Sequence, residues 1–216
     1  MSYGVQCPSC AARDGKESRD VSHTARKHVK TSATVFLILL FLFGATASAD
    51  AQGIEWKTLN DEVMSLYRQG QYDRAVVVAK KALEVAEKAV GPNHPSVAQS
   101  LNNLAGLYNT KGQYAQAEPL FKRALVIREK ALGPEHPDVA ASLNNLAALY
   151  ATQGQYTQAE PLYKRALAIQ EKALGPEHPD MAASLNNLAG LYRKTGRDKE
   201  AEALEKRAKA IRAIVR

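Results

Sequence analysis

Apolar residues recur at helical spacing along the chain from residue 55 onwards, in stripes separated by short polar turns. Residues three and four apart lie on the same face of an α-helix, so these stripes predict amphipathic helices that each bury one face. Two successive stripes are Leu101, Leu104, Ala105, Leu107 and Tyr108, and Ala117, Leu120, Phe121, Ala124 and Leu125. We expect the small residues Ala105 and Ala147 to lie where two helices approach closely.

The segment between the two stripes, Asn-Thr-Lys-Gly-Gln-Tyr, predicts a tight turn. Gly112 can take the positive φ that ends a helix, because it has no Cβ to clash. Pro119 comes early in the second helix, and we expect it near the first turn, where a missing N–H costs least. Gly133 then closes the second helix, and the prolines that follow prevent its continuation. Each unit is therefore predicted to be an antiparallel helix pair.

This unit is repeated along the chain. Gly-Gln-Tyr begins at Gly70, Gly112 and Gly154, with a Gly-Arg-Asp variant at Gly196, so the interval is 42 residues each time. Residues 97–138 and 139–180 differ at only 8 of 42 positions, which indicates a recent internal duplication. Periods of ~20–50 residues are typical of solenoids, because one unit cannot bury its apolar face alone. We place repeats 1 to 4 at about 55–90, 97–132, 139–174 and 181–216, within a domain of residues 50–216.

Residues 1–49 have the pattern of a leader and signal peptide rather than of a repeat. A basic lead precedes an apolar run that starts at Val35, and Ala47-Ser48-Ala49 has the form that signal peptidase cleaves. The run is shorter than the ~20 apolar residues of a membrane span, so the order predicts a secretory signal peptide. We expect an exported protein, periplasmic or secreted. If cleavage fails, the segment anchors the chain with the repeats facing outward, because the basic flank stays in the cytoplasm.

The lead before this apolar run is unusually long. Translation from Val29 would give a compact signal peptide, so residues 1–28 are a candidate mis-assigned start. That start would remove Cys7 and Cys10, the only two cysteines of the chain. In the full chain they would be half of a zinc ribbon or a redox pair, but a zinc site needs four ligands and there is no second cysteine pair. We predict no metal and no cofactor.

Charge and candidate chemistry do not change this picture. Lys and Arg total 29 against 22 Asp and Glu, and they occur in mixed runs, which favours solvated helix faces over a nucleic-acid-binding stripe. His94, His136 and His178 recur one repeat apart. Stacked helices lie ~10 Å apart, too far for these residues to share a Zn ion that each ligand contacts at ~2.1 Å. We interpret them as hinge residues that cap or pack, and we do not expect an enzyme.

The repeat resembles the tetratricopeptide repeat, in the longer variety found in kinesin light chains. The resemblance rests on the segments Leu-Asn-Asn-Leu-Ala and Leu-Gly-Pro-Glu-His-Pro and on the spacing of a set of repeat 2 residues. That set is Leu101, Leu104, Ala105, Tyr108, Gly112, Tyr114, Ala117, Phe121 and Ala124. Leu101, Leu143 and Leu185 replace the signature Trp, and the coiled-coil heptads of kinesin light chains are absent. Transport along a cytoskeleton is therefore not implied.

The resemblance implies an all-α fold, a right-handed α-solenoid of about four helix pairs, in which the first helix of each pair lines a concave groove. It also implies that the groove presents Asn side chains, and an amide can both donate to and accept from the backbone of an extended peptide. The groove residues we predict are Asn60, Gln99, Asn102, Asn103, Asn109, Asn144, Asn145, Asn186, Asn187 and Arg193. For the second Asn of each Asn-Asn pair we favour the alternative that it ties adjacent helices together, and for the first Asn both roles stay open.

The function we expect is an exported protein–protein interaction scaffold that binds a peptide segment or a partner protein in the groove. Two alternatives remain open, a self-associating structural module and an accessory binder of envelope polymers such as glycan. We also expect Ile211, Ile214 and Val215 of the last helix to be partly uncovered. An uncovered apolar end favours pairing with a second copy, so we predict a weak two-fold homodimer.

We predict that the mature protein begins near Asp50, directly after the cleavage motif. N-terminal sequencing of the exported protein should therefore read Asp50 or a residue just after it. A purified chain that retains residues 1–30 would reject both the cleavage and the late start.

Overall fold

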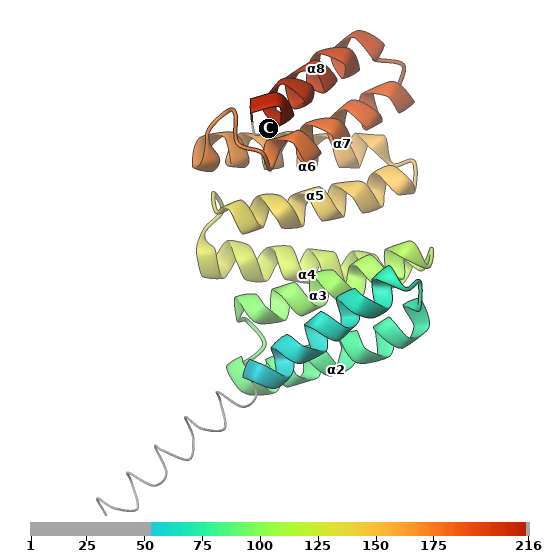
Figure 1. Ribbon diagram of the computed structural model, residues 1–216, viewed down its shortest axis with the longest axis vertical. Helices are drawn as coiled ribbons and strands as arrows, with labels where there is room; N and C mark the ends of the chain where they lie inside the picture. Colours follow the sequence, from blue (N-terminus) through green and yellow to red (C-terminus); the bar gives the residue numbers. More distant parts are fainter. Residues whose placement is uncertain (1–52, 215–216) are drawn as a thin grey trace, which may run out of the picture. The chain divides into compact units, whose positions relative to one another are not determined.

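A computed structural model describes residues 53–214 of the chain (Figure 1). The predicted signal peptide, its cleavage site and the two cysteines lie outside these residues. The chain divides into two units, Met1–Ala51 and Gln52–Arg216, and all described helices belong to the second. None of the described helices is both long and apolar enough to cross a membrane.

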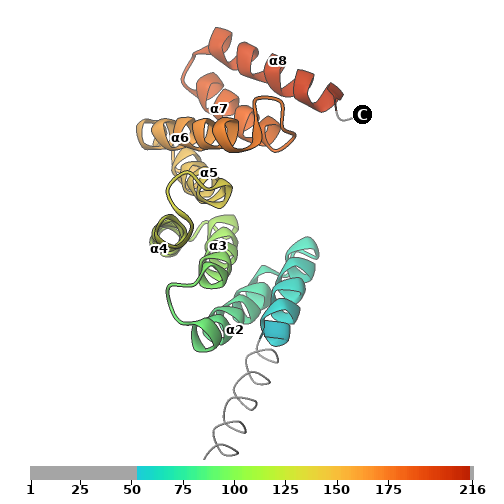
Figure 2. The same ribbon diagram turned by 90° about the vertical axis from the view of Figure 1, so that its left-hand side faces the viewer.

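The second unit is an array of helix pairs, with no strand between residues 53 and 214. Its first helix covers residues 53–68. The following helices are α2 (Tyr72–Val90), α3 (Pro95–Thr110), α4 (Tyr114–Leu132), α5 (Pro137–Thr152), α6 (Tyr156–Leu174), α7 (Met181–Lys194) and α8 (Asp198–Ile214). Helix pairs stack one on another, and successive pairs are rotated along the stack (Figures 1 and 2). The predicted all-α repeat fold is confirmed.

A glycine turn joins the two helices of each pair. At Gly112 φ is +70°, and its N–H donates to the carbonyl of Asn109 at 2.9 Å while the N–H of Gln113 donates to the carbonyl of Tyr108 at 2.8 Å. These two bonds form a Schellman motif, which satisfies carbonyls at the end of α3. The equivalent Gly154 has a φ of +74°. The expected positive φ is confirmed, and it explains why glycine recurs in this turn.

A histidine begins the first helix of the next pair. Gly133 ends α4 with a φ of +87°, and Nδ1 of His136 then accepts a hydrogen bond from the N–H of Asp138 at 3.1 Å. His94 accepts from the N–H of Ser96 in the same way, at 3.2 Å. Such a bond satisfies one of the free donors at a helix N-terminus. The interpretation of these histidines as capping hinge residues is confirmed.

Pro119 does not lie where the sequence predicts. α4 begins at Tyr114, directly after the glycine turn, so Pro119 falls in the second turn of the helix rather than near the first. Its missing N–H leaves the carbonyl of Ala115 without its usual partner. Both residues are exposed, so water can bond the free carbonyl and the proline is tolerated.

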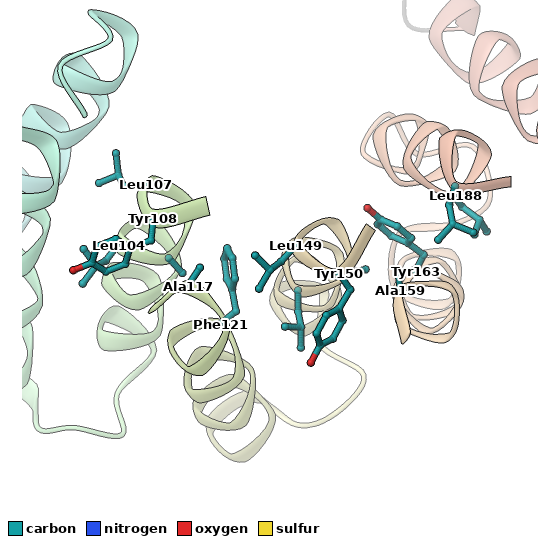
Figure 3. Close-up of a cluster of buried hydrophobic side chains, with 14 of the residues drawn as sticks. Leu104, Leu107, Tyr108, Ala117, Phe121, Leu149, Tyr150, Ala159, Tyr163 and Leu188 are labelled. Carbon is teal, nitrogen blue, oxygen red and sulfur yellow. The ribbon is translucent and has the colours of Figure 1, made fainter. Parts of the chain in front are cut away.

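Small and large apolar side chains alternate through the core of the stack. Ala105 and Ala147 have no exposed surface, and they let α3 pack against α5 and α5 against α7. Phe121 and Tyr163 of the second helices fill the space between successive pairs, each with 3% of its surface exposed. Figure 3 shows this cluster extending from one pair to the next. The expected burial of the two alanines is confirmed.

A series of ion pairs joins the second helix of one repeat to the second helix of the next. The pairs are Arg123–Glu87 at 2.6 Å, Arg165–Glu129 at 2.7 Å and Arg207–Glu171 at 2.7 Å. Exposed ion pairs contribute only ~0.2–1 kcal/mol each. Because the three pairs occupy equivalent positions, they favour one register of stacking more than they add stability.

The last helix corrects one expectation. Ile211 is only 2% exposed and packs against Met181 and Leu185 of α7. The prediction that Ile211 is partly uncovered was therefore wrong, because α8 turns this residue onto its own pair. The side chains of Ile214 and Val215 lie outside the described residues, and a homodimer through this helix stays a prediction.

Ala147→Leu should destabilise the protein, because Ala147 is fully buried where α5 meets its neighbours. Overpacking of this kind costs ~1–3 kcal/mol, and each kcal/mol lowers Tm by about 2–4 °C in a chain of this size. Ala168→Leu is the matched control, since Ala168 is exposed on α6 at the position where repeat 2 carries Val126. Equal Tm values for Ala147→Leu and wild type would contradict the packing described here.

Glu160 on α6 joins repeat 3 to repeat 4. Its carboxylate contacts Nζ of Lys164 at 2.7 Å and Nη1 of Arg197 at 2.9 Å, and the guanidinium of Arg197 also lies over the ring of Tyr192 at 3.8 Å. Hydrogen bonds from Lys164 and Arg197 lower the pKa of Glu160 to about 2. A carboxyl with a lowered pKa stabilises the fold while it is ionised, and this contribution is lost as pH falls from the ordinary pKa towards the lowered one.

Glu160→Gln should therefore lower Tm at neutral pH, by the equivalent of about 1 kcal/mol, the upper end for exposed ion pairs. The gap to wild type should close as the pH falls from 4.5 to about 2 in a series of thermal melts. Glu118→Gln is the matched control, because Gln155 stands where repeat 4 has Arg197 and Glu118 therefore lacks that partner. A gap that stays constant down to pH 2 would rule out ionisation of Glu160 as its cause.

Candidate functional site

A hollow of about 270 Å³ lies on the face formed by the first helices of repeats 1, 2 and 3. Helix 53–68, α3 and α5 supply its walls, and Phe121 of α4 reaches it from the layer of second helices. The lining residues are Val63, Met64, Tyr67, Asn102, Asn103, Gly106, Leu107, Asn109, Thr110, Phe121, Asn145 and Ala148. Of the groove residues predicted from the sequence, this hollow brings together Asn102, Asn103, Asn109 and Asn145.

The wall from repeat 1 presents apolar surface to solvent. Met64 is 44% exposed and Tyr67 is 42% exposed, although both are large apolar side chains. The ring of Tyr67 meets the ring of Tyr72 edge-on, with centroids 5.5 Å apart, and such pairs favour one ring orientation. The hollow therefore has an apolar wall in which the ring of Tyr67 is ordered by Tyr72 but stays exposed to solvent.

In repeats 2 and 3 the first Asn of the Asn-Asn pair contacts the next repeat. Nδ2 of Asn102 donates to the hydroxyl of Ser142 at 3.3 Å, and Nδ2 of Asn144 donates to the hydroxyl of Ser184 at 2.6 Å. Asn102 is 8% exposed. Asn102 thus joins α3 to α5 and also lines the hollow, so its place is compatible with both of the roles left open for it.

The second Asn of each pair does not have one common role. Nδ2 of Asn103 donates to Oδ1 of Asn60 at 2.8 Å and so ties α3 to helix 53–68. Asn145 and Asn187 are exposed. The favoured alternative, a tie between adjacent helices, therefore describes Asn103 but not the other two residues. Asn60 itself is buried between repeats 1 and 2.

Several amide oxygens of this face lack a hydrogen-bond partner within residues 53–214. They are Oδ1 of Asn102, Asn109 and Asn144. An unsatisfied buried acceptor costs ~1–3 kcal/mol. A donor that reaches such an oxygen after a small rotation of the side chain would remove this cost, so Asn102 and Asn109 are available to bind a group in the hollow.

The remaining predicted groove residues lie outside the hollow. Gln99 is exposed on α3, and Asn186 on α7 is half-buried. Arg193 makes two hydrogen bonds to the carboxylate of Glu205, at 2.8 and 2.7 Å, and these bonds raise the pKa of Arg193. The guanidinium is therefore already paired with a residue of its own repeat.

Met64 and Tyr67 are among the lining residues that the sequence analysis missed. Met64 and Tyr67 precede Gly106 and Asn109 by one repeat length of 42 residues. The repeat alignment alone therefore places them on the same face, and extending the groove prediction to repeat 1 would have identified them. The sequence of repeat 1 differs most from the other repeats, so the correspondence of Met64 with Gly106 and of Tyr67 with Asn109 is not evident from residue identity.

A buried cation lies between α4 and α5. Arg128 of α4 is 9% exposed, and its Nη1 donates to the hydroxyl of Ser142 and to the carbonyl of Asp138, both at 3.0 Å. Burial lowers the pKa of Arg128. Ser142 thus accepts bonds from both Arg128 and Asn102. In the part of the chain that the structure describes, no cluster of three or more His, Cys, Asp or Glu side chains could hold a metal ion.

Comparison with curated proteins gives short matches only. Residues of this chain are 51% identical to nephrocystin-3 of Xenopus laevis over 39 residues, which cover 18% of this chain. Nephrocystin-3 of Mus musculus matches over the same length with the same identity. The chain spans 3% of the length of these relatives, so the match concerns a single repeat.

Solved structures match over most of the array. BtubC (BKLC) from P. vanneervenii has a TM-score of 0.66 and 29% identity, covering 76% of this chain and 64% of that one. Nearly identical TPR-like repeats of a kinesin light chain from Podosopora anserina have a TM-score of 0.64 and 32% identity, covering 73% and 74%. PilF of Pseudomonas aeruginosa, at 17% identity and a TM-score of 0.58, shares the fold.

The sequence profile of the tetratricopeptide repeat matches this chain in three overlapping windows. They are residues 57–130, 96–172 and 138–213. Together they cover the four helix pairs of the described part, and the first two structural neighbours above are kinesin light chain-like proteins of this kind. The chain belongs to the tetratricopeptide repeat family, whose repeats serve as protein-interaction scaffolds.

Proposed function

We propose that this chain is an exported scaffold that binds an extended peptide segment of a partner protein across the first helices of repeats 1 to 3. The observation that carries the proposal is the hollow, which combines exposed apolar side chains with amide groups. An extended peptide presents the complementary groups, since its side chains can fill the apolar part and its backbone N–H and C=O groups can pair with amides.

The charge of the hollow also favours a peptide. None of its lining residues carries a charged side chain. A phosphate or a polyanion binds mainly through Lys and Arg, so the hollow offers little to a nucleic acid. Its neutral wall suits an uncharged stretch of polypeptide.

The proposed export rests on the leader. The order of basic lead, apolar run and Ala47-Ser48-Ala49 is that of a secretory signal. Residues 50–216 contain no cysteine, which is compatible with an oxidising compartment. The partner would then be a protein of the envelope or of the exterior.

Selection of random displayed peptides against the exported protein tests this proposal. Enriched peptides should bind saturably in fluorescence anisotropy, and the double variant Asn109→Ala with Asn145→Ala should weaken binding about tenfold, which corresponds to about 1.4 kcal/mol. Both residues line the hollow. We expect this loss because each amide can pair with the peptide backbone.

The control is Lys130→Ala, because Lys130 is exposed on α4, away from the hollow. It should leave the peptide affinity unchanged. Wild-type affinity of the double variant would reject groove binding. Sedimentation that shows mass growing with concentration would instead favour the self-associating module, and co-sedimentation with cell-wall glycan would favour the polymer binder.

A further inference from the structure

Gly106 occupies a position where the fold does not require glycine. It lies in the interior of α3, and glycine is among the least favourable residues in a helix interior. A Cβ built on Gly106 meets no atom within 4 Å, so no neighbouring backbone or side chain excludes a larger residue. Repeat 3 carries Ala148 at the equivalent position. Gly106 therefore reduces helix propensity without serving the packing of the array.

The open space beside Gly106 is the hollow itself. Gly106 lies on its wall together with the exposed Met64 and Tyr67 and the buried Phe121. The hollow measures about 270 Å³, near the lower end of the ~300–1,000 Å³ of ligand pockets. Such a space accommodates one large side chain rather than a whole small molecule.

The two near-identical repeats differ most where they contribute to this hollow. Repeats 2 and 3 differ at 8 of 42 positions. The residues of repeat 2 that line the hollow make up one sixth of the 42 positions. They nevertheless include three of the eight differences, at Gly106, Asn109 and Phe121. Repeat 3 carries Ala148, Ala151 and Tyr163 at these positions, so it cannot present the same wall to a ligand.

Polar groups on the wall of the hollow point to a polypeptide ligand. Asn102 is 8% exposed and lines the hollow, and its Oδ1 accepts no hydrogen bond from residues 53–214. Asn109 lines the hollow with an unpaired Oδ1 as well. Asn144 repeats the arrangement of Asn102, so the oxygen of Asn109 is the stronger indication: after a small rotation of its side chain it can accept from an N–H group that flanks a side chain in an extended peptide.

We propose that the hollow takes one bulky apolar side chain, such as Leu, Met or Phe, from an uncharged stretch of the bound peptide, and that Gly106 sets its depth. The inference rests on the proposed function and names the residue that anchors the peptide. Because repeat 3 has Ala148 and Ala151 at the positions of Gly106 and Asn109, the anchor also fixes the register in which the peptide lies on the Asn residues.

Gly106→Leu tests the proposal, because the new side chain fills the hollow while the helix gains propensity. Removing glycine should raise Tm by a few degrees, since a chain of this size gains about 2–4 °C per kcal/mol. The same variant should weaken the binding of library-selected peptides at least tenfold in fluorescence anisotropy. A more stable protein that binds less well is an outcome that loss of folding cannot produce.

Gly190→Leu is the matched control. Gly190 is the equivalent residue in α7, and a Cβ there also meets no atom within 4 Å, but it does not line the hollow. It should raise Tm similarly and leave peptide affinity unchanged. Equal losses of affinity in the two variants would overturn the assignment to this hollow, and so would wild-type affinity of Gly106→Leu.

Exchange of the apolar residue of the selected peptide completes the test. Replacing it by Ala should weaken binding to the wild-type protein, but should cost much less in Gly106→Leu, because the two changes remove the same contact. Additive losses would overturn the proposal. If Gly106→Leu lowers Tm, Gly106→Ala replaces it and should weaken binding several-fold.

The two proposals can fail separately. The selected peptides can bind the Asn109 and Asn145 double variant weakly but bind Gly106→Leu as tightly as wild type. That result would support groove binding and overturn only the proposed anchor. The absence of any saturable peptide binding would overturn both.

Discussion

The structure depends on one constraint, which is that a single helix pair has apolar surface on two sides and can cover neither by itself. Ala105, Ala147 and Ala189 are the residues that resolve it, each with at most 1% of its surface exposed. Their small size lets neighbouring first helices pack closely, and Phe121 and Tyr163 then fill the gaps between pairs. Stability in such an array is a sum of repeat and interface terms, so a change at one of these alanines affects both neighbouring repeats.

This constraint also determines where the array is free to vary. The glycine turn recurs in all four repeats, and the core alanine and the capping histidine recur in repeats 2 to 4, because stacking needs them. Residues on the first-helix face do not contribute to stacking in the same way, and there repeats 2 and 3 diverge at Gly106 and Asn109. The core alanines and the glycine turns are identical in the two copies, whereas Gly106 and Asn109 on the first-helix face are replaced.

The repeat period and the turn residues were sufficient to predict the fold, because helix spacing and the positive φ of Gly112 are local properties of the sequence. The roles of the Asn residues were not predictable, since Asn102 bonds Ser142 of the next repeat and that contact depends on how far successive pairs are rotated. The same holds for Ile211, whose burial depends on the angle at which α8 returns onto α7. Pro119 lies in the second turn because α4 begins directly after the glycine turn, at Tyr114, three residues before the apolar stripe starts at Ala117.

The unpaired amide oxygens distinguish residues that stack the repeats from residues that can bind a ligand. Asn102 and Asn144 occupy equivalent positions, both bond a serine of the next repeat, and both leave Oδ1 without a partner among the described residues. The free-energy cost of this unpaired oxygen recurs with the repeat and therefore follows from the stacking geometry. By itself it indicates no ligand. Asn109 is different, because repeat 3 has Ala151 at this position and stacks equally well. Stacking does not require the buried, unpaired oxygen of Asn109, and its place on the wall beside Gly106 makes it the stronger indication that this hollow binds a hydrogen-bond donor.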